Sequence, residues 1–243
     1  MRKWASLFVF TSLLAAAGCG SIGNKEKVKG NGQVTSENRN AGGNFTGVHT
    51  RGNFNVFVTI GNTASVKIEG ESNILPYIET YVESGKLVVQ SKDNVSLNTI
   101  QPVKVYVTSP QLNKIESEGM GDIVGQTPIT DPSKIELQLK GNGNVNLEVD
   151  APEVEAIVGG IGGIQLKGQT KNFECKLMGN GTLSAFDLQT EQTKLTILGN
   201  GGADVSASVK LDVTIAGNGN VRYKGNVTPD KTITGNGNIT QVQ

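Results

Sequence analysis

A short glycine-rich turn recurs along the second half of this chain, and its spacing constrains the fold more than any other feature. The turn has the form Gly-x-Gly and recurs at intervals of 18 to 22 residues, beginning at Gly119, Gly141, Gly160, Gly179, Gly199, Gly217 and Gly235. Self-similarity at a fixed period of this length is typical of a solenoid, in which each repeat forms one coil and stacks on its neighbours. We therefore expect the turns to be corners of a repeating architecture.

Each period contains two short segments in which apolar and polar residues alternate, such as residues 145–149 after one turn and 173–177 before another. Alternation with a period of two predicts strands with one buried face. Before each turn there are two positions at which apolar residues recur from one period to the next, so that each position forms a column. One of these columns consists of Leu137, Ala156, Cys175, Leu195 and Val213, with Lys231 in the last period. These features predict an all-β protein whose residues 111–243 form a parallel β-helix. A terminal coil that faces solvent explains Lys231.

Asparagine occupies the centre of five turns, and we expect these amides to stack as a structural ladder along one corner of the coils. The ladder consists of Asn142, Asn180, Asn200, Asn218 and Asn236, followed by Gly143, Gly181, Gly201, Gly219 and Gly237. Gly217 and Gly219 are expected to adopt backbone angles that other residues resist.

The first half of the sequence has a different pattern. Residues 44–110 contain strand-like segments joined by longer loops, so we expect a more sheet-like start that covers the first coil. Residues 40–243 then form a single domain of 18 to 22 residues per coil.

The N-terminus reads as a lipoprotein leader. Arg2 and Lys3 precede an apolar segment too short to span a bilayer, and small residues lead directly to Cys19. This pattern resembles a bacterial lipobox, which implies that residues 1–18 are a signal peptide and that Cys19 carries the lipid. An ordinary signal peptide cleaved near Ala17 is the alternative. Polar residues 19–39 are predicted to form a flexible tether, and the protein is predicted to be exported and lipid-anchored to the cell envelope, at the outer membrane.

Charge and cysteine content exclude several classes. The chain has 22 Lys and Arg against 22 Asp and Glu. Removal of the leader subtracts Arg2 and Lys3, which leaves 20 against 22, a net charge of −2. This balance excludes nucleic-acid binding and predicts no polybasic membrane patch. The mature chain retains only Cys175, so it forms no intrachain disulfide.

The order of the segments resembles a known family. The stretch FTGVHTRGNFNVFVTIG, then VKIEGESNILPYIETYVESGKLVV, then VYVTSPQLNKIESEGMGDI and the Gly-x-Gly-Asn coils are similar to the head GIN domain family. Members of this family are called auto-transporter adhesins. The resemblance covers roughly residues 40 to 225 and implies a right-handed parallel β-helix of the pectin-lyase type. It implies a role in cell adhesion and brings no catalytic residue set.

No catalytic, cofactor or phosphate site is predicted. Cys175 lies in an apolar column, which favours a buried structural thiol over a nucleophile. His49 has no second His to form a metal pair, which favours a solvated or partly packed side chain. The Gly-x-Gly turns lead into strands, whereas phosphate loops lead into a helix N-terminus. Calcium binding of the repeat-in-toxin kind fails because only the first turn carries an Asp, Asp122.

Three outward-facing columns remain as candidates for binding. Glu136, Glu155 and Glu174 are expected to stack one per coil. This column is interpreted either as a solvated charged face or as a divalent-cation site. An apolar stripe of Ile157, Met178, Leu198 and Ala216 is expected to be covered by the N-terminal region, or else to bind a partner. A polar column after the turns could hydrogen-bond a glycan, and it consists of Asn146, Gln165, Ser184, Asp204, Arg222 and Thr240.

The sequence as a whole indicates a non-catalytic lipoprotein whose β-helix serves in adhesion or in binding a glycan or cell-surface protein. One alternative is a polysaccharide lyase or hydrolase on the same fold, since fold does not determine function. Another is a structural protein of the envelope that assembles through its exposed coil ends.

Overall fold

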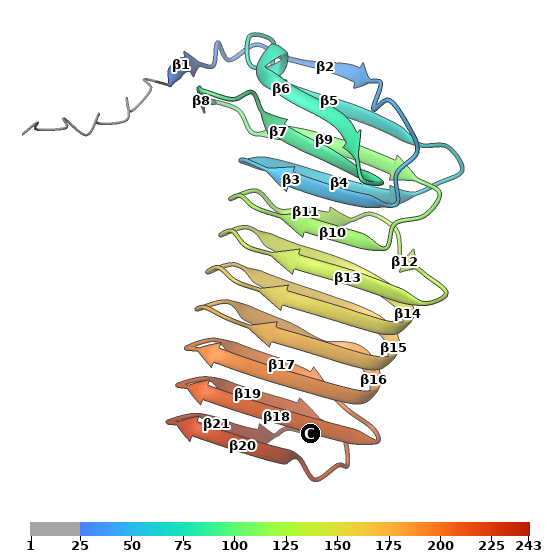
Figure 1. Ribbon diagram of the computed structural model, residues 1–243, viewed down its shortest axis with the longest axis vertical. Coiled ribbons are helices and arrows are strands. Elements are labelled where there is room, and N and C mark those ends of the chain that lie inside the picture. Colours follow the sequence, from blue (N-terminus) through green and yellow to red (C-terminus); the bar gives the residue numbers. More distant parts are fainter. Residues whose placement is uncertain (1–24) are drawn as a thin grey trace, which may run out of the picture.

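The computed structural model describes residues 25–243, and these form a parallel β-helix of about seven turns (Figure 1). The all-β solenoid predicted from the turn spacing is confirmed. The predicted leader and Cys19 lie outside the described residues. Residues 25–243 contain 21 strands around one continuous buried apolar core, so this part of the chain has the core of a folding unit.

The N-terminal portion contains nine strands and one short 3-10 helix. They are β1 (Glu26–Lys29), β2 (Val34–Arg39), β3 (Gly47–Arg51), β4 (Phe54–Ile60), β5 (Ser65–Glu71), η1 (Leu75–Tyr77), β6 (Ile78–Glu83), β7 (Lys86–Ser91), β8 (Val95–Asn98) and β9 (Val103–Ser109).

The coils that follow contain the remaining strands. They are β10 (Lys114–Ser117), β11 (Ile123–Gly125), β12 (Ile129–Thr130), β13 (Lys134–Leu139), β14 (Asn144–Val158), β15 (Gly163–Leu177), β16 (Thr182–Gly199), β17 (Gly202–Ser206), β18 (Lys210–Gly217), β19 (Asn220–Lys224), β20 (Asp230–Gly235) and β21 (Asn238–Gln241).

The coils stack into two parallel faces that enclose the core. The face made by the segments before the turns, here called face A, runs from β7 through β3, β10 and β13, then through the second halves of β14, β15 and β16, to β18 and β20. The opposite face, face B, runs from β9 through β4 and β11, then through the first halves of β14, β15 and β16, to β17, β19 and β21. The three long strands bend from face B into face A at the corner opposite the glycine turns.

The strand register places the predicted apolar columns inside the solenoid. Leu137, Ala156, Cys175, Leu195 and Val213 pair in succession across neighbouring coils, and each is no more than 2% exposed. Lys231 pairs with Val213 in the last coil and is exposed. A stack of identical inward positions buries one apolar side chain per coil, so hydrophobic burial repeats along the whole axis.

The N-terminal portion is part of the solenoid as well as its cap. Strands β3, β4, β7 and β9 already run parallel within the two faces, whereas β2, β5 and β6 add antiparallel pairs above them. These antiparallel strands cover the first coil, at the end of the molecule opposite the C-terminus (Figure 1).

The prediction of a flexible tether over residues 19–39 is wrong for its second half. β1 pairs in parallel with β8, and β2 pairs in antiparallel fashion with β5. The polar composition of this segment suggested a linker, but edge strands of a cap need only one apolar contact. Here Val28 supplies that contact by packing against the core.

The turn glycines are required chiefly by the close approach of stacked backbones. A Cβ atom on Gly143 would lie 2.0 Å from the carbonyl oxygen of Gly121 in the coil above. Gly217 has a φ of +140°, in the region that favours glycine, as expected. Gly219 does not have a positive φ, which contradicts the expectation. Its restriction is steric, because a Cβ there would lie 2.7 Å from Cγ2 of Ile197.

Candidate functional site

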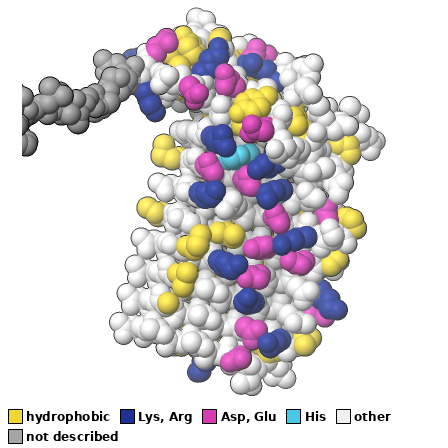
Figure 2. All heavy atoms as spheres, viewed as in Figure 1, with side chains coloured by type: hydrophobic (Ala, Val, Ile, Leu, Met, Phe, Trp, Pro, Cys, Tyr) yellow, Lys and Arg dark blue, Asp and Glu magenta, His cyan; other side chains and the backbone are white. Residues whose placement is uncertain are grey.

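Face A carries a ladder of intermixed positive and negative side chains along the axis of the solenoid (Figure 2). Its central column follows the predicted register and consists of Lys114, Glu136, Glu155, Glu174, Lys194 and Asp212. Outward alternation on each strand places these side chains in solvent at one coil spacing from one another. The ladder extends from the N-terminal cap to the last coils.

The three stacked glutamates are each paired with lysine. Lys114 Nζ lies 2.8 Å from a carboxylate oxygen of Glu136, and Lys134 Nζ lies 2.7 Å from one of Glu155. Lys176 Nζ lies 3.0 Å from Glu174, and its hydrogen bond holds the pKa of that carboxyl below its ordinary value. Three negative carboxylates stacked in one column would repel one another, and these lysines offset that repulsion.

This pairing contradicts the hypothesis of a divalent-cation site at Glu136, Glu155 and Glu174. A cation would have to displace several ammonium groups to gain carboxylate ligands. No three His, Cys, Asp or Glu side chains within residues 25–243 are grouped so that they could hold a metal ion. The glutamate column is therefore part of a surface ion-pair network, of a kind that contributes little stability per exposed pair.

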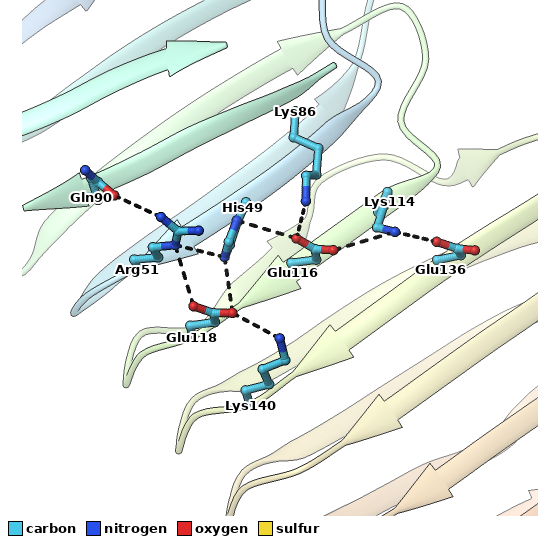
Figure 3. Close-up of polar contacts among 9 residues, drawn as sticks. All are labelled: His49, Arg51, Lys86, Gln90, Lys114, Glu116, Glu118, Glu136 and Lys140. Atoms are coloured by element: carbon cyan, nitrogen blue, oxygen red, sulfur yellow. Dashed lines mark hydrogen bonds and ion pairs between the residues drawn. The ribbon is translucent and has the colours of Figure 1, made fainter. Parts of the chain in front are cut away.

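The N-terminal end of this ladder surrounds a buried histidine (Figure 3). His49 on β3 is only 5% exposed. Its Nδ1 lies 3.5 Å from Glu116, its Nε2 lies 3.5 Å from Glu118, and the Arg51 Nε donates a 3.3 Å hydrogen bond to Nε2. Lys86 on β7 lies 2.7 Å from Glu116, so the cluster joins the cap strand β7 to β3 and β10. The sequence had placed His49 as solvated or partly packed, and the structure shows that its neighbours bury it.

The surroundings of His49 favour its neutral form. Burial and then the Arg51 guanidinium lower the pKa of His49, against the opposing effect of Glu118 and Glu116. A neutral ring that accepts a hydrogen bond at Nε2 from Arg51 carries its own N–H on Nδ1, facing Glu116. Burial is the largest single influence and raises the pKa of Glu116, but the hydrogen bond from Lys86 and the nearby positive charges of Lys86 and Lys114 together lower it overall. The cluster therefore combines ionised carboxylates with an uncharged imidazole.

Cys175 lies in the centre of the core. It is fully buried, and this burial raises the pKa of its thiol far above the ordinary range. A thiol that cannot ionise makes a poor nucleophile.

The apolar stripe lies in two neighbouring outward columns of face A. Ile157 pairs with Lys176, so it belongs to a different column from Met178, Leu198 and Ala216. Met178 and Leu198 are each 49% exposed. The N-terminal strands lie at the end of the solenoid (Figure 1), and the exposure of Met178 and Leu198 shows that this stripe is uncovered, which contradicts the expected cover.

Four of the five turn asparagines stack. Asn200 donates to Asn180 over 3.2 Å, Asn218 to Asn200 over 3.1 Å and Asn236 to Asn218 over 3.4 Å. Asn142 stands apart, because the intervening turn has Ile161 at its centre. The turn asparagines thus bond to one another along the corner, with their amides used in coil-to-coil contacts.

Face B presents the polar column in the register that the sequence predicted. Asn146 pairs with Gln165, and Gln165 with Ser184, in three successive coils. With Asp122 and Asn144 these residues line a shallow groove of about 300 Å³. Asp204 and Arg222, lower in the same column, form an ion pair in which the Arg222 Nε lies 2.7 Å from the carboxylate.

The three central side chains of this groove are available to bind a ligand. Asn146, Gln165 and Ser184 are exposed, and within residues 25–243 none of their side chains has a hydrogen-bond partner. Asp122 and Asn144 are engaged instead. The Asp122 carboxylate accepts a 2.8 Å bond from the Asn144 backbone N–H, and the Asn144 side-chain oxygen accepts one of 3.2 Å from Gly163. The groove therefore offers donors and acceptors with little net charge.

Sequence reasoning missed an aromatic stack at the N-terminal end of this column. The rings of Phe57 and Tyr106 are stacked with centroids 5.1 Å apart, and the Lys67 ammonium lies 4.8 Å from the Tyr106 centroid. The two rings meet because β4 and β9 are neighbours, although they are far apart in the sequence. Only the strand order could have revealed this pair.

The sequence of the chain matches one known protein family. A family model described as "Putative auto-transporter adhesin, head GIN domain" matches residues 44–227. The chain belongs to the head GIN domain family. The resemblance read from the ordered segments is thereby confirmed.

Solved structures of similar fold come from Bacteroides and Parabacteroides species. A "putative adhesin" from Bacteroides fragilis has a TM-score of 0.83 at 21% identity, over 88% of this head GIN chain and 100% of its own. One of the same description from Parabacteroides distasonis has a TM-score of 0.70 at 23% identity, covering 89% and 100%. A "putative lipid binding protein" from the same organism has a TM-score of 0.72 at 21% identity, covering 90% and 100%. At these identities the likeness establishes the fold alone.

No curated protein sequence matches the chain. Among residues 25–243 there is no helix long and apolar enough to cross a membrane.

Proposed function

We propose that this head GIN protein is a lipid-anchored protein of the cell envelope whose face B binds glycans without catalysing a reaction. The observation that carries the proposal is the groove on face B, where Asn146, Gln165 and Ser184 present unused polar groups at one position of three successive coils. The adhesin description of the family supports a binding role.

The chemistry of the groove suits a neutral or weakly charged saccharide. Amide side chains donate and accept in one plane, and a hydroxyl does both, which matches the mixed donors and acceptors of sugar hydroxyl groups. The coil spacing of about 4.8 Å repeats these groups along a line. A ligand whose hydroxyls repeat along a chain can therefore contact several coils at once.

Anchoring at Cys19 and export to the outer membrane are parts of the same proposal. They rest on the lipobox-like residues before Cys19 and on the adhesin description of the family, which supports a place outside the cytoplasm. Two or three acyl chains on one cysteine give stable membrane attachment, whereas a single chain binds only marginally. Intact-mass measurement of the membrane fraction would show diacylglycerol on Cys19, and an unmodified Cys19 would refute the anchor.

A glycan array probed with residues 25–243 tests the binding role. We expect binding to a limited set of saccharides, which the triple variant Asn146→Ala/Gln165→Ala/Ser184→Ala loses. Each truncation should weaken binding by about 2- to 10-fold, the effect of one net hydrogen bond. The matched control is Thr196→Ala/Thr214→Ala/Thr232→Ala, which shortens three outward side chains in one column of face A.

Two results would overturn the proposal. The first is equal loss of binding by both triple variants, which would place the ligand elsewhere. The second is the release of unsaturated or reducing-end products from an acidic polysaccharide, which would make the domain a lyase or hydrolase.

A further inference from the structure

The first strand of the structure carries a cluster of lysines at the end of the molecule where the predicted lipid anchor attaches. Lys27 and Lys29 alternate with Val28, which packs against the core, so the two lysines point into solvent. Lys25 precedes the strand and is exposed as well. Lys92, between β7 and β8, adds a fourth exposed ammonium group, 5.9 Å from the Tyr77 ring centroid.

These lysines are held in a fixed position by the cap. β1 pairs with β8 along its whole length, and the Gly30 N–H donates to the Asn98 carbonyl over 2.9 Å. Just beyond β1, the buried Glu71 carboxylate accepts hydrogen bonds from Gly32 N–H over 2.6 Å and from Ile100 N–H over 2.8 Å. The segment that composition marked as a tether is thus an ordered basic edge of the fold.

Little negative charge opposes this cluster. Within residues 25–243 none of the four lysines has a carboxylate at ion-pair distance, unlike the lysines of face A. Glu26 and Asp93 are the acids beside them in the sequence, and Tyr77 donates a 3.2 Å hydrogen bond to Glu26. Residues 1–24 contain no Asp or Glu. The chain as a whole has equal numbers of basic and acidic residues, but this end of the molecule has a local positive surface. The expectation of no polybasic patch rests on the total charge and does not consider how the charges are distributed.

The chain length places this surface next to the membrane. Glu26 lies seven positions after Cys19, and an extended chain spans at most about 3.6 Å per residue, so the strand lies within about 25 Å of an acylated cysteine. At this distance an anchored domain samples positions in which the lysines enter the screened field of the lipid headgroups, which extends about 8–10 Å. A tether of twenty residues would have allowed the domain to diffuse far from the surface.

We propose that the lysines of β1, with Lys92, dock the capped end of the β-helix on an anionic lipid surface. The contact supplements the acyl chains and directs the C-terminal coils away from the membrane, since β1 and the last coil lie at opposite ends (Figure 1). This inference rests on the proposed anchoring at Cys19 for its geometry. The lysine surface itself is a feature of residues 25–243 and can be tested without the lipid.

The test is co-sedimentation of non-acylated residues 25–243 with vesicles of phosphatidylglycerol and phosphatidylethanolamine, against vesicles of phosphatidylcholine. We expect binding to the anionic vesicles only, and it should weaken as salt is added. The variant Lys25→Gln/Lys27→Gln/Lys29→Gln should bind about fivefold more weakly for each lysine removed, roughly a hundredfold in all. The control Lys171→Gln/Lys224→Gln/Lys231→Gln removes the same charge elsewhere and should bind like the wild type.

Three outcomes would overturn the inference: no binding to anionic vesicles, equal loss in both triple variants, or equally tight, lysine-dependent binding to a soluble anionic polysaccharide. The last would make the surface a polymer site. Because the assay uses non-acylated protein, its result is independent of the mass measurement on Cys19, so failure of the anchor and failure of the docking surface are distinguished. Circular dichroism of each variant confirms that the strands persist.

Discussion

Asn218 donates a hydrogen bond from its side-chain amide to the side-chain oxygen of Asn200, which lies one coil nearer the N-terminus, over 3.1 Å. The same side chain accepts a bond from Asn236 in the following coil. Asn200 and Asn218 are thus each both donor and acceptor, whereas Asn180 at one end of the ladder accepts and Asn236 at the other donates, as in stacked amide ladders of cross-β structures. A motif that resembles a ligand-binding loop serves here to join coils.

Replacement of Asn218 by alanine should therefore lower stability while leaving ligand binding intact. The change removes two exposed hydrogen bonds, so the free energy of unfolding should fall by about 1–2 kcal/mol. Denaturant unfolding followed by circular dichroism measures the loss. Asn142→Ala is the matched control, since Asn142 lies outside the ladder and its loss should be smaller. Loss of glycan binding by a folded Asn218→Ala variant would show that the corner is a binding site.

Cys175 should resist thiol reagents until the β-helix unfolds. Its side chain is fully buried in register with Ala156 and Leu195, and burial raises its pKa. In a denaturant series, the fraction modified should follow the global unfolding transition seen by circular dichroism. Cys175→Ser should lose about 1–3 kcal/mol of stability, because its hydroxyl is buried among apolar side chains, and Cys175→Ala should lose less. Rapid labelling of the native protein would contradict a structural role.

His49 should make the junction between the cap and the coils sensitive to mild acid. Burial and Arg51 hold the pKa of His49 below its ordinary value of about 6.5, so the unfolded chain takes up a proton at a higher pH than the folded chain does. The stability that the neutral ring contributes is fully present at pH values above the ordinary histidine pKa. It is lost as the pH falls below that pKa. Thermal unfolding at about pH 7.5 and 5.5 should show a fall in melting temperature on acidification.

The variant His49→Gln removes this titration, so its melting temperature should change less over the same interval. Glu116 and Glu118 also have lowered pKa values, but their contribution is lost only as the pH falls below the ordinary range of carboxyl groups, near 4.5. An equal pH dependence in wild type and His49→Gln would assign the effect to other groups.

The sequence alone could predict the coils but could not predict the pairing of side chains between them. Cys175, Ala156 and Leu195 were placed in one buried column by counting from the turns, because parallel in-register stacking repeats one residue environment per coil. The same counting found the Glu136–Glu155–Glu174 column. It could not find the neutralising Lys134, whose long side chain reaches diagonally to Glu155 in the next coil.

The N-terminal portion was harder to predict because it does not repeat. The parallel neighbours β4 and β9, which bring Phe57 and Tyr106 together, are separated in the chain by the four strands β5 to β8. Composition marked the lysine-rich segment near β1 as a linker, since one apolar residue, Val28, gives no period. Its ordering depends on partners such as Glu71, which lies about 40 residues away and is fully buried.

Lys231 should prevent the open end of the β-helix from stacking on other molecules. It stands in the inward column below Val213, and β20 and β21 each pair with a strand on one side only within residues 25–243. Beside it Ile233 is 38% exposed at the end of the core. An inward-pointing charge on an edge strand opposes edge-to-edge association, because stacking would bury the ammonium without a partner.

Replacement of Lys231 by valine completes the apolar column and should promote association at the C-terminal end. Sedimentation velocity over a concentration series should show dimers or longer assemblies for Lys231→Val and monomers for the wild type. Lys171→Val makes the same change of charge and hydrophobicity at an exposed corner and should remain monomeric. If the wild type already assembles through this end, the envelope-assembly alternative gains support and Lys231 is not a barrier. If Lys231→Val stays monomeric, the exposed edge strands are protected by their own geometry.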